Sequence, residues 1–172
     1  MKRASTCIVL HPWRRCVPNH DSPSYLDLTA FFSSIAWVIG DLSAYPYDHW
    51  INQSPNIVIV SIYFRMESFG FLTHPSFVSD SSLADLNVGF KDQILALRWV
   101  KDHIASFGGD PDHVTINGES AGAASVIMHM VANENPGNKL GVGERLFDGV
   151  IARSVDREFM PTPEQQEVSE RS

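Results

Sequence analysis

The pattern of hydrophobic and polar residues changes after the first fifty-five positions. Residues 11–25 mix prolines, aromatics and charges with a period of neither 3.6 nor 2.0, which predicts irregular structure. Residues 26–40 are largely apolar and predict a buried segment, with helix and strand equally open. Residues 44–55 are rich in turn formers, and Pro46 and Pro55 bracket them.

From residue 56 onward the pattern alternates between strand and helix. The β-branched or apolar runs that predict strands are 56–65, 113–117 and 147–154. The segments that predict helices are 83–107, where apolar residues recur every three or four positions, and 121–131. Loops are predicted at 66–80 and 133–143. This alternation is typical of a parallel sheet with crossover helices, so the predicted fold class is α/β.

The composition is that of an acidic globular domain. Of the 172 residues, 44% are hydrophobic and 19% are charged, with a formal net charge of −7. Lysines and arginines are scattered except for the pairs Lys2–Arg3 and Arg14–Arg15, whereas nucleic-acid binding needs a basic face or stripe. No apolar run approaches the ~18 residues of a membrane span. We therefore expect neither a nucleic-acid partner nor a transmembrane segment.

The N-terminal residues and the cysteines leave localisation unknown. Lys2 and Arg3 precede only a short apolar patch at 7–10, which does not make a convincing signal peptide. The cytoplasm is the default, unless the true N-terminus is not in this sequence. Cys7 and Cys16 are the only cysteines, and two free thiols are favoured over a disulfide.

Two small groups of acidic residues and histidine are candidate metal ligands. Asp48 with His49, and Asp110 and Asp112 with His113, match no zinc or calcium spacing. No phosphate-cradling glycine loop is present either. We therefore expect no metal and no cofactor.

One segment carries recognisable chemistry, residues 107–122 with the sequence FGGDPDHVTINGESAG. It contains a G-x-S-x-G pattern centred on Ser120, between a predicted strand and a predicted helix. A serine in such a turn is held at strained backbone angles, with its hydroxyl exposed at the end of the sheet. The helix that follows directs free N–H groups at a developing oxyanion, and the Ala121 N–H is the natural first donor. The alternative, a glycine–serine turn without chemistry, is disfavoured by this context.

At these residues the chain resembles the type-B carboxylesterases, a group that includes cholinesterases and fungal lipases. FGG at 107–109 and VTINGESAG at 114–122 are similar to the serine signature of that family. The upstream blocks that resemble the family are NVGFKDQ at 87–93, AL at 96–97, WV at 99–100, YFR at 63–65 and FGFL at 69–72. The blocks stand in the family's order within about 38–154.

The resemblance implies a partial α/β-hydrolase fold, a mostly parallel sheet with crossover helices and a nucleophile elbow. It also implies a serine esterase or lipase that acts on small-molecule esters or lipids. Ser120 would be the nucleophile that forms an acyl-enzyme, and the Ala121 N–H would be one oxyanion donor. Gly118 and Gly122 would shape the elbow, and Glu119 would be its variable neighbour.

Two charged residues in the matching blocks are interpreted as structural. Arg65 and Asp92 lie in predicted internal positions, where charges are usually paired. The expected organisation has an irregular N-terminal segment at 1–37 that does not match the family, a partial hydrolase domain at 38–160 and a polar tail at 161–172.

The chain departs from the family in the loop that supplies further oxyanion donors. Residues 38–41, VIGD, resemble the sequence just past a glycine-rich loop, but the preceding residues 33–37 are SSIAW and lack its glycines. Loss of one oxyanion donor costs about 10²–10³ in rate. We therefore expect reduced or no activity.

The triad base and acid are the second departure, because neither is identifiable. The family places them after the serine, yet His129 is the only histidine that follows Ser120. Nine helical residues put it about 13 Å along the helix axis, beyond hydrogen-bond reach. His103 and His113 are expected at the wrong edge of the sheet. The histidines that spacing does not exclude are His11, His20, His49 and His74.

The sequence thus favours a carboxylic-ester hydrolase acting through Ser120, truncated with respect to its family. The alternative is a non-catalytic, esterase-like remnant or a binding protein that lacks the triad base and acid. A histidine within reach of Ser120 separates the two hypotheses. Ester specificity and oligomeric state stay open.

Overall fold

A computed structural model describes residues 7–10, 26–32, 47–54, 56–80, 85–134 and 145–155. The elements in chain order are β1 (Cys7–Leu10), β2 (Leu26–Phe32), α1 (Asp48–Gln53), β3 (Ile57–Tyr63), α2 (Glu67–Phe71), α3 (Pro75–Ser79), α4 (Val88–His103), the 3₁₀ helix η2 (Ile104–Phe107), β4 (Gly109–Glu119), α5 (Ala121–Glu134) and β5 (Gly149–Arg153).

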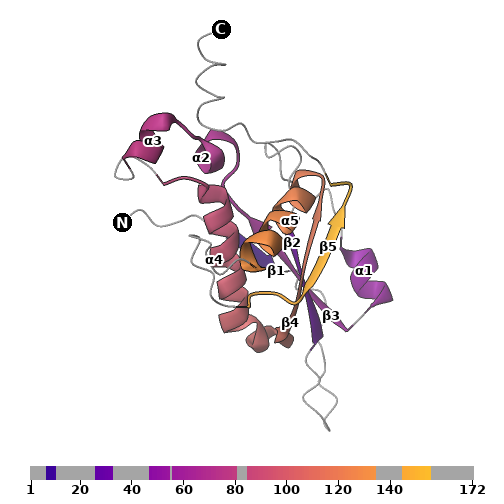
Figure 1. The fold of residues 1–172 in the computed structure, drawn as a ribbon. Helices are drawn as coiled ribbons and strands as arrows, with labels where there is room; N and C mark the ends of the chain where they lie inside the picture. The colour runs from indigo at the N-terminus through magenta and orange to yellow at the C-terminus, as the bar shows by residue number, and fades with distance from the viewer. Residues whose placement is uncertain are drawn as a thin grey trace.

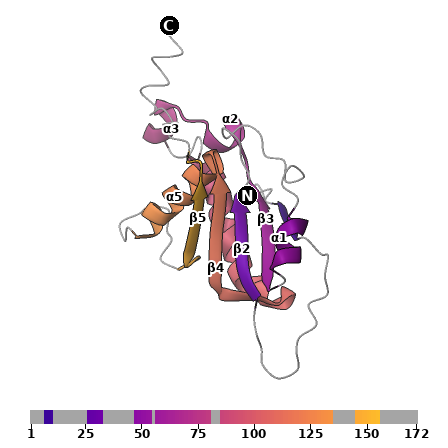
Figure 2. The same cartoon turned by 90° about the vertical axis from the view of Figure 1, so that its right-hand side faces the viewer.

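The described strands form one five-stranded sheet in the order β1-β3-β2-β4-β5. The β1 strand is antiparallel to β3, and every other neighbouring pair is parallel. Figure 2 shows β5, β4, β2 and β3 side by side along the sheet. The predicted α/β class with a mostly parallel sheet is confirmed.

Helices cover both faces of this sheet, and the strand pattern explains how. Along β3, Val60 and Ile62 face the larger core, which α4 and α5 complete. On the opposite face Ile59 packs with Tyr47 and Trp50 beside α1. Figure 1 shows α4 and α5 on one side of the strands and α1 on the other. Because both faces are covered, β3 reads as a continuous apolar run.

The long helix predicted at 83–107 is correct in its centre and wrong at both ends. The α-helix starts at Val88, because Asn87 adopts left-handed backbone angles with φ 54°. It ends at His103, and the next four residues form η2, which stops at Gly108 with φ 83°. Hydrophobic spacing alone does not distinguish an α-helix from the 3₁₀ turn that extends it.

Three further predictions need correction or completion. The loop predicted at 66–80 contains α2 and α3, each of five residues. The turn-rich stretch 44–55 contains α1. The segment 26–40, open between helix and strand, contains β2.

The N-terminal segment 1–37 therefore supplies two strands, β1 and β2, at its described positions. Its predicted irregular part at 11–25 lies outside the described residues, as do 33–46, most of the loop at 133–143 and the tail at 161–172. The domain boundaries at 37/38 and 160/161 stay predictions.

Candidate active site

Ser120 occupies a sharp turn between β4 and α5. The strand ends at Glu119, the helix begins at Ala121, and the single residue between them has φ 55°. Left-handed angles cost a residue with a Cβ about 1–2 kcal/mol, so the surrounding structure holds the serine in this conformation. Figure 1 shows β4 running into α5 at the end of the sheet where the parallel strands finish.

Gly118 makes the turn sterically possible. A Cβ on Gly118 would lie 2.2 Å from the carbonyl oxygen of Gly122 and 2.8 Å from the backbone nitrogen of Ala123. Real Cβ atoms do not approach backbone this closely. Gly118 is therefore required for the last residues of β4 to contact the first turn of α5. The predicted strand–turn–helix geometry is present, whereas the chemical role of Ser120 stays a prediction.

Backbone hydrogen bonds fix the serine in place. Its N–H donates to the Arg153 carbonyl at the end of β5 over 3.0 Å, and its carbonyl accepts from the Ala124 N–H over 3.0 Å. The first N–H groups of a helix have no acceptor within the helix. The Ser120 N–H is already used, so the first N–H of α5 is that of Ala121. Its role as an oxyanion donor stays a prediction.

Arg153 joins this turn to the opposite face of the sheet. While its carbonyl accepts from Ser120, its guanidinium carbon lies 5.4 Å from the ring centroid of Trp50 in α1. A guanidinium over an indole face is a favourable cation–π contact. One residue thus connects the elbow, β5 and α1, a relationship that no sequence motif indicated.

The predicted structural ion pair is present. Arg65 follows β3 and Asp92 lies in α4, and two charge-assisted hydrogen bonds of 2.7 Å join the guanidinium to the carboxylate. The Arg65 N–H also donates to Asp92 over 3.1 Å. The hydrogen bond and the charge of Asp92 raise the pKa of Arg65. The pair connects the end of a central strand to the helix that covers it.

A buried polar cluster joins α4 to α5 one turn beyond the elbow. The Gln93 amide nitrogen donates to the Ser125 hydroxyl over 3.2 Å, and its oxygen lies 2.6 Å from Nε2 of His129. An amide oxygen only accepts, so His129 carries its proton on Nε2. Gln93, Ser125 and His129 are all buried. Sequence reasoning missed this cluster because Gln93 is more than thirty positions from both Ser125 and His129.

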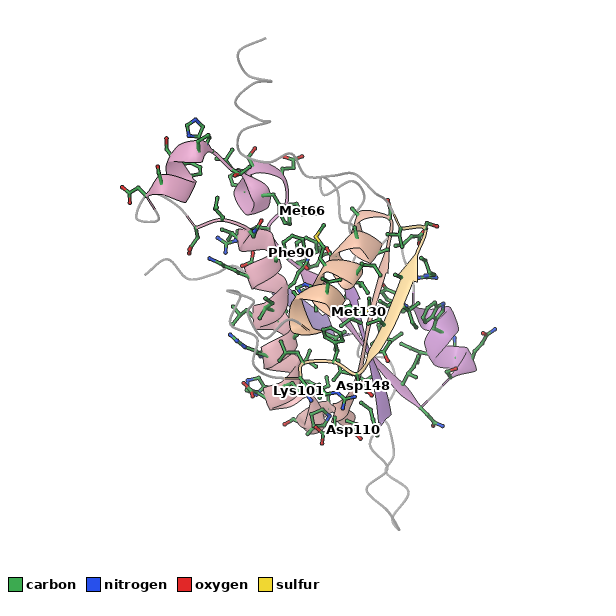
Figure 3. All side chains as sticks on the ribbon, in the orientation of Figure 1. Met66, Phe90, Lys101, Asp110, Met130 and Asp148 are labelled. Carbon is green, nitrogen blue, oxygen red and sulfur yellow. The ribbon has the colours of Figure 1, made fainter. Side chains whose placement is uncertain are left out.

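His129 is unsuited to be the catalytic base for Ser120. Its Nε2 is engaged with Gln93, and its ring meets Phe90 edge-on with centroids 5.7 Å apart. Figure 3 shows Phe90 of α4 beside α5, where this contact forms. Burial lowers the pKa of His129 to about 4, so the ring is neutral at physiological pH. Its place in the core agrees with the exclusion made from helix geometry.

The other described histidines have structural partners. His113 contacts Asp110 over 3.1 Å, and Figure 3 shows Asp110 at the end of the sheet opposite the elbow. His103 lies against Trp99, with ring centroids 5.0 Å apart. Nδ1 of His74 accepts from the Ser76 N–H and caps α3.

The remaining histidines are His11 and His20, outside the described residues, and His49, whose side chain is not described. Within the described residues, no set of three or more His, Cys, Asp or Glu side chains is arranged to hold a metal ion. The same residues contain no helix long and apolar enough to cross a membrane.

Comparison with known proteins agrees with this geometry. The model of the carboxylesterase family matches residues 17–168, including part of the N-terminal segment in which the sequence showed no resemblance. The chain is 40% identical over 130 residues to acetylcholinesterase from Electrophorus electricus, covering 75% of this chain and 19% of that protein. It is 36% identical over 152 residues to lipase 2 from Geotrichum candidum, covering 86% of this chain and 26% of the lipase.

The chain is also similar to a solved esterase structure. The crystal structure of Aspergillus niger EstA matches with a TM-score of 0.62 at 36% identity, covering 75% of this chain and 23% of EstA. The chain therefore spans about a quarter or less of these relatives. The family match over most of the chain, the mostly parallel sheet and the strained serine together show that the chain belongs to the carboxylesterase family and has part of the α/β-hydrolase fold.

Proposed function

We propose that the chain carries the nucleophile of a serine carboxylic-ester hydrolase. The observation that supports this most strongly is the backbone of Ser120, a non-glycine residue at φ 55° between β4 and α5. Strained backbone of this kind persists where the surrounding structure over-determines it, and it is concentrated at functional sites.

In the proposed reaction, the Ser120 hydroxyl attacks the carbonyl carbon of an ester. The proton passes to a base, the alcohol leaves, and an acyl-enzyme forms that water then hydrolyses. The Ala121 N–H stabilises the negative oxygen of the tetrahedral intermediate. The substrate class is small-molecule esters or lipids, in keeping with the cholinesterase and lipase relatives.

The base and its acid partner are not supplied by the histidines whose contacts are described. His129 is buried against Gln93, and His113 pairs with Asp110. His74 immediately precedes α3, and its Nδ1 is used to cap that helix. We propose that the base comes from outside the described residues, and that this chain alone has reduced or no turnover.

The test is hydrolysis of p-nitrophenyl butyrate by the purified 172-residue chain. Ser120→Ala removes the proposed nucleophile, and Ser79→Ala, an exposed serine at the end of α3, is the matched control. Turnover that disappears in Ser120→Ala and survives in Ser79→Ala supports the hydrolase. Measurable turnover that is equal in all three proteins overturns the role of Ser120, and no turnover in any of them favours the second candidate below.

The second candidate is a non-catalytic, esterase-like binding protein. The observation that favours it is that no described histidine is shown in contact with Ser120, whereas His129 and His113 have other partners. It predicts a folded protein that binds a non-hydrolysable ester analogue without turnover. Binding that is unchanged in Ser120→Ala would favour this candidate over the hydrolase.

A further inference from the structure

Two wholly buried polar side chains lie in the central strands below the elbow. Ser61 of β3 and Asn117 of β4 are both 0% exposed. The Ser61 hydroxyl and both polar atoms of the Asn117 amide have no hydrogen-bond partner among the described residues. Buried polar atoms in folded proteins are nearly all hydrogen-bonded, so three such atoms need a physical explanation.

The strand register places these two residues at one level of the sheet. Phe31 of β2 is the register partner of Ser61 on one side and of Asn117 on the other. Register partners on neighbouring strands point to the same face, and strands lie about 4.8 Å apart, so the two backbones are about 10 Å apart. Ser61 follows Ile59 by two positions, so both side chains lie on the same face of β3. This is the face beside α1.

The neighbouring side chains on this face do not supply the missing hydrogen bonds. Ile59 precedes Ser61 by two positions, and Ile151 of β5 is the register partner of Asn117; both are apolar. Thr115 and Glu119, which flank Asn117 on the same face of β4, are polar, but neither is hydrogen-bonded to the Asn117 amide. The β4 backbone is paired with β2 and β5 at this level, so its N–H and C=O groups are engaged in the sheet. An unpaired amide in such a place is costly.

Water satisfies such groups best, because a single small molecule offers both donors and acceptors. The Asn117 amide needs an acceptor for its NH₂ group and a donor for its oxygen. The Ser61 hydroxyl can either donate or accept a hydrogen bond. A charged or purely accepting ligand would leave one half of the amide unpaired.

We propose that this face of the sheet contains an internal hydration site, in which ordered water hydrogen-bonds to the Asn117 amide and the Ser61 hydroxyl. Asn117 stands three residues before Ser120 on the strand that leads into the elbow. The site therefore anchors the end of β4 from the face opposite α5. This inference is independent of the proposed esterase function.

The first test measures magnetisation transfer from water to the Asn117 side chain in the full ¹⁵N-labelled chain. Asn117→Leu assigns the resonances of the amide by removing them, and Asn117→Asp serves for assignment where the leucine variant does not fold. Cross-peaks between water and the Asn117 NH₂ protons, with opposite signs in NOESY and ROESY spectra, are expected for bound water. Cross-peaks to a protein hydroxyl or amide proton instead, or no water cross-peak, would overturn the site.

The second test compares melting temperatures. Asn117→Leu has nearly the same shape but breaks the hydrogen bonds to water, so it should lower Tm by about 2–8 °C. The control is Asn52→Leu, the same change at an exposed position of α1, which should leave Tm within about 2 °C. A rise in Tm for Asn117→Leu would show that the amide is unsatisfied and would contradict the proposal.

Discussion

Gln93 of α4 and His129 of α5 are joined by a buried hydrogen bond, with 2.6 Å between the amide oxygen and Nε2 of the ring. Gln93 also donates to Ser125, four residues before His129 on α5, so one side chain contacts two successive turns of the helix that begins at the elbow. These contacts fix the rotation of α5 about its own axis and its position along that axis relative to α4. The position of the Ala121 N–H depends on both.

This contact predicts a loss of stability in acid. Burial lowers the pKa of His129 from 6.5 to about 4, so between those pH values the unfolded chain binds a proton that the folded chain does not. The contribution of His129 to the free energy of unfolding is fully present above about pH 6.5. It is lost as the pH is lowered to about 4, by about 3 kcal/mol in total. Urea unfolding at pH 7, 5.5 and 4 measures it.

The control for this prediction is His129→Gln, which keeps a partner for Gln93 and does not titrate. Its free energy of unfolding should depend less on pH over the same range. An equal dependence on pH in the two proteins would assign the effect to other groups.

Asp92 should be far more important for stability than the exposed acid at Asp85. Asp92 is nearly buried and accepts three hydrogen bonds from Arg65, whereas Asp85 is exposed and pairs with Lys91 on the surface. Asp92→Asn weakens a pair in which the carboxylate is buried and the guanidinium is partly exposed, and should cost about 2 kcal/mol. Asp85→Asn should cost about 0–1 kcal/mol. Equal losses in urea unfolding would show that the Arg65 pair is no stronger than a surface one.

Gly118→Ala should prevent formation of the elbow. The added methyl group would lie 2.2 Å from the carbonyl oxygen of Gly122, and only a movement of backbone relieves that contact. We expect a loss of about 3 kcal/mol and no reaction of Ser120 with a fluorophosphonate.

Gly108→Ala is the matched control, because Gly108 has φ 83° but open space around its Cβ position. It should cost about 1–2 kcal/mol and leave any reaction of Ser120 intact. Equal behaviour of the two alanine variants would contradict the steric account of the elbow.

Ser120→Gly should be more stable than Ser120→Ala. Alanine keeps the Cβ that makes φ 55° unfavourable, whereas glycine adopts this angle without strain. The lower entropy cost of ordering alanine offsets part of the gain, which leaves about 0.5–1 kcal/mol in favour of glycine. Chemical denaturation of both variants measures the difference. A more stable alanine variant would mean that the turn is not strained.

The sequence predicted most of what lies close together along the chain. The G-x-S-x-G pattern at 118–122 located the turn, and the apolar run at 56–65 located β3. The two short helices within 66–80 were missed because five residues are too few for a helical period to show. The break between α4 and η2 was missed because the apolar spacing continues through it.

Contacts between distant segments were not predictable. The insertion of β2 between β3 and β4 depends on packing across the whole sheet. The hydrogen bond from the Ser120 N–H to the Arg153 carbonyl depends on the same packing. Arg65 and Asp92 were interpreted as ion-paired because buried charges need partners. No comparable rule singled out Gln93 and His129, whose roles appear only when α4 and α5 lie side by side.

The most direct test of the account is the site of covalent labelling by a fluorophosphonate ester, read by mass spectrometry of the folded chain. A strained serine at the N-terminus of α5 predicts one adduct, on Ser120, that is absent in Ser120→Ala and retained in Ser79→Ala. An adduct on another residue instead, or an adduct equally strong in Ser120→Ala, would contradict the claim that Ser120 is an esterase nucleophile.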